Sequence, residues 1–207
     1  MTVTSVTAQI KRPSRSSVFI DGEFAFGMDS GDLAALSVKV GMELDEGALK
    51  KLMDEKIFAD AKNAALKYLS HRARTQREIE KRLEEYGFPP ETIIKTLELV
   101  KKYKYVDDEA FARDYAESRL NSGNYGPRRI MRELKIKGVP DLLAKNAMAA
   151  ALANYDEDGA VAAWLKRKSV DPAEIDDKKR RRLANSLAAG GFSFESARRA
   201  LSGESYE

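Results

Sequence analysis

The chain has 207 residues, 33% of them charged, and a formal net charge of +3. Its apolar content supports one or two domains with a real core, while the lack of cysteine excludes disulfides and thiolate metal sites. With no apolar run of 18 residues and no signal-peptide pattern at its N-terminus, the chain is expected to be cytoplasmic, without membrane association.

Residues 1–57 predict a small α/β head. Apolar residues alternate on both sides of Asp21-Gly22, which is a strong signal for a β-hairpin. Asp29 and Asp45 are each expected to cap a short helix after the strands. A domain of this size is near the limit at which it needs a neighbour for stability.

Residues 58–106 predict a first three-helix unit. Thr75 and Glu78 form a capping box at the start of its second helix, which is expected to end at Gly87. Pro89-Pro90 then starts a third helix. Its expected core face comprises Ile93, Ile94, Leu97 and Val100.

A landmark in this unit recurs twice more, in residues 107–155 and 156–207. In each copy a leucine lies four positions before a glycine. An apolar residue directly follows the glycine, and a new helix starts shortly afterwards. The three pairs are Leu83 and Gly87, Leu134 and Gly138, and Leu187 and Gly191. We therefore expect a mainly α-helical chain of three tandem three-helix repeats, forming an elongated, curved solenoid behind the head. The link between the first two helices of the third repeat is longer than its counterparts.

The sequence shows no constellation for catalysis, and no metal or cofactor is expected. The single histidine, His71, has no second histidine with which to share a metal, and its expected helix-end position favours a surface or capping role. No phosphate-cradling Gly-x-x-x-x-Gly-Lys-Ser/Thr run occurs. Glu78 and Arg82 are spaced for a surface ion pair. A protein that binds, and is not an enzyme, is the favoured interpretation.

Basic clusters recur at or near the second helix of each repeat. Each alone could be a solvated face, but their recurrence favours a shared contact surface for an acidic protein or a phosphate backbone. The candidate residues are Arg72, Arg74, Arg77 and Lys81, then Arg128, Arg129, Arg132, Lys135 and Lys137, then Lys166 and Arg167. Arg128 and Arg132 are expected to matter more than the run 178–182, whose charge nearby aspartates offset.

Two tyrosines flank a lysine at Tyr103-Lys104-Tyr105. Bases stack on rings in such settings, but packing of the tyrosines between repeats is the favoured interpretation.

The order and spacing of several motifs over residues 60–202 resemble the RecX family of RecA regulators. They are Leu69-Ser70-x-Arg72, Glu78-Ile79-x-x-x-Leu83, Tyr105-Val106-Asp107-Asp108-Glu109-x-Phe111-Ala112, Gly126-Pro127-Arg128-Arg129-Ile130-x-x-Glu133-Leu134 and Gly191-Phe192-Ser193-Phe194. The head lies outside this match. The resemblance implies a non-enzymatic protein that lodges in the groove of the RecA filament on single-stranded DNA. There it would suppress ATP hydrolysis, strand exchange and the SOS coprotease role.

Two alternatives stay open beside a monomeric RecA-filament inhibitor. The recurring basic helices also suit a stand-alone helical module that binds nucleic acid directly. A scaffold with solvated charges would bind neither.

Overall fold

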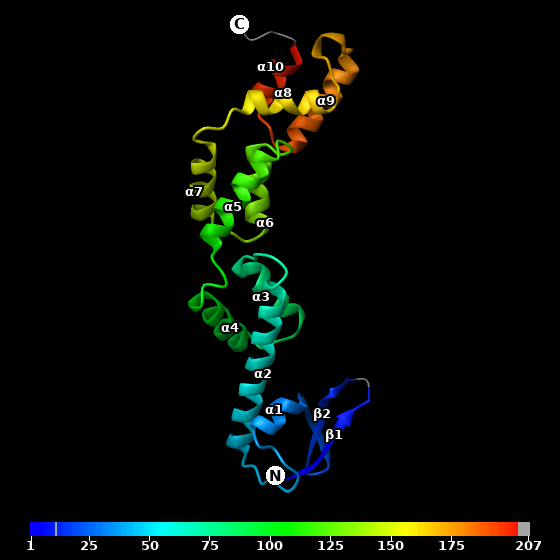
Figure 1. Ribbon diagram of the computed structural model, residues 1–207, viewed down its shortest axis with the longest axis vertical. Coiled ribbons are helices and arrows are strands. Elements are labelled where there is room, and N and C mark those ends of the chain that lie inside the picture. Colours follow the sequence, from blue (N-terminus) through cyan, green and yellow to red (C-terminus); the bar gives the residue numbers. More distant parts are fainter. Residues whose placement is uncertain (11, 203–207) are drawn as a thin grey trace. The chain divides into compact units, whose positions relative to one another are not determined.

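The computed structural model describes residues 1–10 and 12–202, and in this part the chain is mainly helical (Figure 1). The described residues form three strands, ten α-helices and one short 3-10 helix. Two compact units result, one from Met1–Tyr68 with Arg82–Leu99, and one from Leu69–Lys81 with the chain from Val100 onward. The expected mainly helical fold behind a small sheet is therefore confirmed.

The head contains an antiparallel sheet in the order β1-β2-β3, with strands Val3–Gln9, Arg12–Ile20 and Glu23–Asp29. Asp21 and Gly22 join β2 to β3, and both have positive φ, 49° and 89°. This geometry suits a two-residue hairpin turn, as the Asp-Gly pair predicts.

Two helices follow the sheet, and the first of them packs against β2 and β3. The side chain of Asp29 caps α1 (Ser30–Ala35), and Asp45 accepts a hydrogen bond from the Ala48 amide at the start of α2 (Glu46–Leu69). Lys56 of α2 is buried and pairs with Asp32 at 3.2 Å and Asp60 at 2.6 Å. Helix α2 runs without a break through residue 57, where the head was expected to end, so head and first repeat share one helix.

The first repeat continues with α3 (Gln76–Glu85) and α4 (Pro90–Lys102). Its capping box is confirmed, because the Glu78 amide donates to Thr75 Oγ1 at 3.1 Å and the Thr75 amide donates to Glu78 Oε2 at 3.2 Å. The core face of α4 was predicted one residue too wide: Ile93 is buried, but Ile94 is 57% exposed. Ile93, Leu97 and Val100 follow i, i+4, i+7 spacing, and Ile94 lies 100° round the helix from Ile93, outside this stripe.

The second and third repeats each have the expected three helices. Repeat two comprises α5 (Asp108–Asn121), α6 (Pro127–Ile136) and α7 (Asp141–Leu152). Repeat three comprises α8 (Glu157–Arg167), α9 (Asp177–Gly190) and α10 (Phe194–Ser202). The longer link before α9 holds the 3-10 helix Pro172–Glu174. Each repeat has its own core, built around Ile130 and Leu134 in one and around Leu187 and Phe192 in the other.

The three landmark glycines end their helices in the same way. Gly87, Gly138 and Gly191 have φ of 76°, 78° and 89°. In each case the amide of the following apolar residue donates to the carbonyl of the landmark leucine, at 3.1–3.2 Å. The leucines are fully buried. The sequence landmark is therefore a left-handed helix cap of the Schellman type.

Two of these glycines also dock one repeat on the next. Gly138 lies so close to Arg77 that an added Cβ would overlap Arg77 Cβ and Cγ. Beside it, Thr75 Oγ1 donates to the Lys137 carbonyl at 2.6 Å. Each junction thus places the start of one repeat's second helix against the end of the next repeat's second helix.

The junction between repeats two and three has the same arrangement and uses main-chain atoms. The Gly126 amide donates to the Gly190 carbonyl at 2.8 Å, and the Arg128 amide to the Gly191 carbonyl at 3.1 Å. A Cβ on Gly126 would overlap the Gly191 carbonyl carbon. Both glycines are needed because the two backbones approach too closely for a side chain.

Candidate interaction surface

Helix α6 carries a basic stripe on its outward face. Ile130 and Leu134 are fully buried, whereas Arg128, Arg132 and Lys135 are exposed. Helix periodicity places i, i+4 and i+7 on one side, so the predicted orientation of this stripe is confirmed. Gly126 and Pro127 position the stripe by starting α6 at the junction with repeat three.

The three members of this stripe differ in how they are paired. Lys135 binds Asp141 at 2.7 Å, and Lys145 binds the same carboxylate at 2.7 Å. Hydrogen bonds from Lys135 and then Lys145 lower the pKa of Asp141 to about 2. Arg128 and Arg132 have no ion-pair partner among the described residues. Their charge is therefore available to a partner.

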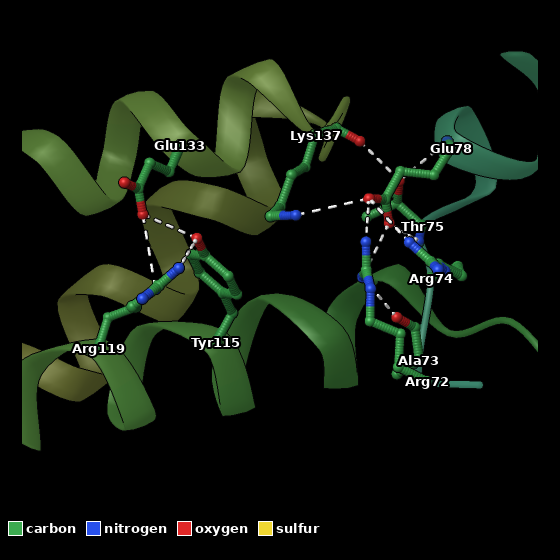
Figure 2. A network of polar contacts seen from close by, with 9 residues as sticks. All are labelled: Arg72, Ala73, Arg74, Thr75, Glu78, Tyr115, Arg119, Glu133 and Lys137. Atoms are coloured by element: carbon green, nitrogen blue, oxygen red, sulfur yellow. Dashed lines mark hydrogen bonds and ion pairs between the residues drawn. The ribbon is translucent and has the colours of Figure 1, made fainter. Parts of the chain in front are cut away.

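A second group of candidate cations converges on Glu78 (Figure 2). Its Oε1 lies 2.8 Å from Arg72 Nη2, 3.4 Å from Lys137 Nζ and 3.9 Å from Arg74 Nη1. Burial alone raises the pKa of Glu78, but hydrogen bonds from Arg72 and the Thr75 amide, with the nearby positive charges, outweigh it and lower that pKa. These cations stabilise the junction between repeats one and two. Arg82, the residue expected to pair with Glu78, binds Glu85 at 3.1 Å.

Replacing Glu78 with glutamine is expected to lower the free energy of unfolding at neutral pH by about 2 kcal/mol, because it removes the negative charge that pairs with Arg72, Arg74 and Lys137. The lowered pKa means that this contribution exists above the ordinary value of 4.5 and disappears as the pH falls through the folded-state value. Urea unfolding from pH 7 to pH 3 should show the wild type and Glu78→Gln converging in acid. Glu80→Gln, which removes a more exposed pair with Arg77, is the matched control. Parallel curves for wild type and Glu78→Gln would contradict this role.

A third group surrounds Glu133 inside repeat two. Tyr115 Oη donates to Glu133 Oε2 at 2.7 Å, and Arg119 Nε lies 3.6 Å from the same oxygen (Figure 2). Arg129 Nε donates to Glu133 Oε1 at 3.0 Å. The Arg119 guanidinium also lies over the Tyr125 ring, at 4.6 Å from its centroid. Burial, followed by the bond to Glu133, raises the pKa of Tyr115. The network therefore braces α5 against α6.

Sequence reasoning missed this network and placed Arg129 among the partner-binding residues. The i, i+4 spacing of Arg129 with Glu133, and of Tyr115 with Arg119, was the available signal. The contacts of Tyr115 and Arg119 with Glu133 could not be predicted, because α5 and α6 are separate segments of the sequence.

Some of the remaining candidate residues are engaged within the protein, and others are exposed without an ion pair in the described ranges. Arg77 pairs with Glu80 at 2.7 Å, and Arg167 Nη2 donates to the Gly123 carbonyl at 2.5 Å, linking α8 to the loop before α6. Lys81 and Lys166 are exposed and lack an ion pair within residues 1–10 and 12–202. The structure thus leaves Arg128, Arg132, Lys81 and Lys166 without an ion-pair partner in that range.

Two further predictions concern isolated residues. Tyr103 and Tyr105 were expected to pack between repeats, but they are 60% and 56% exposed. Their place directly after α4 leaves them in a turn that the neighbouring repeat does not cover. His71 is exposed just beyond the end of α2, as expected for a surface residue. In the described part of the chain, none of the helices has the length and apolar character needed to span a bilayer.

Comparison with known proteins identifies the family. Models of the RecX N-terminal domain and of the first and second RecX three-helix domains match residues 1–45, 61–98 and 107–148. The regulatory protein RecX of Lacticaseibacillus paracasei is 34% identical over 165 residues, which cover 79% of this chain and 68% of that protein. The chain belongs to the RecX family. RecX of Bacillus licheniformis is 29% identical over 205 residues, 99% of this chain and 78% of that protein.

Solved RecX structures share the fold. A crystal structure of regulatory protein RecX matches with a TM-score of 0.60 and 25% identity, covering 96% of this chain and 98% of that one. RecX from Lactobacillus salivarius matches with a TM-score of 0.56 and 24% identity, over 70% of this chain and 94% of that one. The RecX N-terminal model includes residues 1–45, so the head, which seemed to lie outside the family match, is part of it.

Proposed function

We propose that this chain binds the RecA recombinase filament on single-stranded DNA and inhibits its ATP hydrolysis, strand exchange and SOS coprotease activity. It acts by binding, as a cytoplasmic monomer, and catalyses nothing. Membership of the RecX family supports a regulatory role, since the similar proteins are named regulatory proteins. The RecA target is what the resemblance to this family implies.

The proposed contact surface rests on the exposure of two arginines on α6 and on their lack of an ion pair among the described residues. Arg128 and Arg132 are exposed, lie one helical turn apart, and have no ion-pair partner in the part of the chain that the structure describes. Their neighbours Arg129 and Lys137 are held by Glu133 and Glu78. Unpaired guanidinium groups bind carboxylate or phosphate in bidentate fashion and with the smallest loss of internal interactions. A filament of protein and DNA presents both kinds of anion.

The direct test is the rate of DNA-dependent ATP hydrolysis by the cognate recombinase, with saturating single-stranded DNA and increasing amounts of the full chain. We expect inhibition at substoichiometric ratios, because one bound molecule in a filament affects many subunits. An unchanged rate at every ratio would exclude this function.

A second candidate is a module that binds nucleic acid by itself. The exposed cations Lys81, Arg128, Arg132 and Lys166 favour it, since phosphate contacts need no other partner. Fluorescence anisotropy without recombinase, over a salt series, separates the two functions. Tight and steeply salt-dependent binding, together with an unaffected recombinase, would favour the second.

A further inference from the structure

The turn after α4 presents a mixed basic and aromatic surface. We call residues 101–105 the Lys-Tyr turn; its sequence is Lys101-Lys102-Tyr103-Lys104-Tyr105, and all five residues are exposed. The Tyr103 and Tyr105 rings lie side by side, with centroids 6.4 Å apart and planes at 41°. Two exposed rings that lie together form a contiguous apolar patch, which is more informative than a single exposed ring.

The backbone of this turn is strained at Lys104. Helix α4 ends with the same cap as the landmark helices: the Lys104 amide donates to the Lys101 carbonyl at 2.8 Å, and the Tyr105 amide to the Val100 carbonyl at 2.9 Å. Glycine occupies the left-handed position in the three landmark caps, whereas here Lys104 occupies it with φ of 56°. A side chain is disfavoured in this conformation. Backbone strain of this kind concentrates at functional sites, and here the strained residue is a lysine that lies between the two tyrosines in sequence.

Two acidic groups lie near the turn, and the charge of Asp108 offsets part of that of Lys101. Asp107 caps α5 by accepting from the Ala110 amide at 2.9 Å, and Asp108 accepts from the Gln76 amide at 2.8 Å. Lys102 and Lys104 have no ion pair within the described ranges. The positive charge of the turn is therefore available to a ligand.

We propose that the Lys-Tyr turn is a binding site for single-stranded nucleic acid. Its tyrosines stack on bases and its lysines contact the flanking phosphates, the combination that binds single strands with little sequence preference. A duplex is excluded as the preferred ligand, because its bases are already stacked on one another. An acidic protein would engage the lysines but leave the pair of exposed rings without a role. This site needs no recombinase, so it goes beyond the proposed inhibition, and it uses none of the cations on which the second candidate function rests.

The test uses the full chain and fluorescence anisotropy with three labelled ligands: an oligothymidylate, an abasic strand of equal length and a duplex. The wild type is expected to prefer the oligothymidylate. Tyr103→Leu combined with Tyr105→Leu keeps apolar bulk but removes the rings, and should weaken binding by about tenfold or more. That variant should also lose the preference over the abasic strand. Tyr103→Phe with Tyr105→Phe keeps both rings and should bind within about twofold of the wild type.

Lys104→Gly separates recognition from folding. It relieves the left-handed strain, so the Tm is expected to rise by about 2–4 °C. It also removes one phosphate contact, so the slope of log affinity against log salt should fall by about 0.7. A purely structural role for Lys104 predicts the stability gain with an unchanged slope.

Several results would overturn the proposal. One is a leucine pair that still distinguishes the oligothymidylate from the abasic strand. Another is a wild type that binds the duplex as tightly as the single strand. A third is a set of variants that lose only recombinase inhibition while binding free DNA normally, which would make the turn a protein contact. Because all ligands here are free DNA, failure to inhibit the recombinase would leave this site standing, and the reverse also holds.

Discussion

Replacing Gly191 with alanine is expected to lower the free energy of unfolding by about 4 kcal/mol, through backbone strain and steric overlap together. Its φ of 89° disfavours any side chain, and the new Cβ would overlap the Arg129 amide nitrogen across the junction. That neighbour is backbone and cannot rotate away. Urea unfolding followed by circular dichroism measures the loss.

Gly87→Ala is the matched control. Its φ of 76° imposes a similar strain, but an added Cβ would meet no described atom within 4 Å, so a loss of only about 1 kcal/mol is expected. Gly138→Ala should resemble Gly191→Ala, because its Cβ overlaps Arg77, and the β-branched change Gly138→Val should damage folding further. Equal losses at Gly87 and Gly191 would show that these glycines serve only as helix caps and that the repeats do not dock through them.

Reversing the charge of Arg128 and Arg132 together, as Arg128→Glu with Arg132→Glu, is expected to weaken recombinase inhibition by at least about tenfold. The two side chains are exposed and make no internal ion pair within the described residues, so folding should be preserved. The concentration of the variant that halves the ATPase rate, compared with wild type, is the measurement. Circular dichroism confirms the fold.

A second double reversal, Lys178→Glu with Arg182→Glu, changes the net charge by the same amount on an exposed face of α9. It is expected to affect inhibition much less, because Asp176 and Asp177 lie beside this run and already offset its field. Equal loss from both pairs would mean that overall charge, and not the position on α6, governs binding.

Local signals along the chain predicted the helical elements well. The capping box of Thr75 with Glu78, the Asp-Gly hairpin and the three left-handed glycines each depend on residues close in sequence, and each is confirmed. The sequence did not predict that α2 continues through residue 57, because a helical pattern does not show where a helix changes its packing partner. The prediction that Ile94 is buried was wrong, because the adjacent Ile93 fills that place in the core.

The candidate surface was predicted less well than the fold. Positive charge can be counted in a sequence, but whether a cation is engaged depends on carboxylates that folding brings near. Lys137 reaches Glu78 across 59 positions of the chain, and no local pattern links them. Arg128 remains a candidate for partner binding because its side chain is exposed on α6 and its backbone amide, not its side chain, makes the contact with Gly191.

The junction between the second and third repeats has an evolutionary consequence. It is held by hydrogen bonds between main-chain atoms and by two glycines that lack side chains. Substitutions on the outward faces of α6 and α9 therefore leave it intact, provided that Gly126 and Gly191 persist. Such a chain can acquire new recognition residues by point mutation without first compensating for lost stability, so its stacking and its choice of partner can diverge independently.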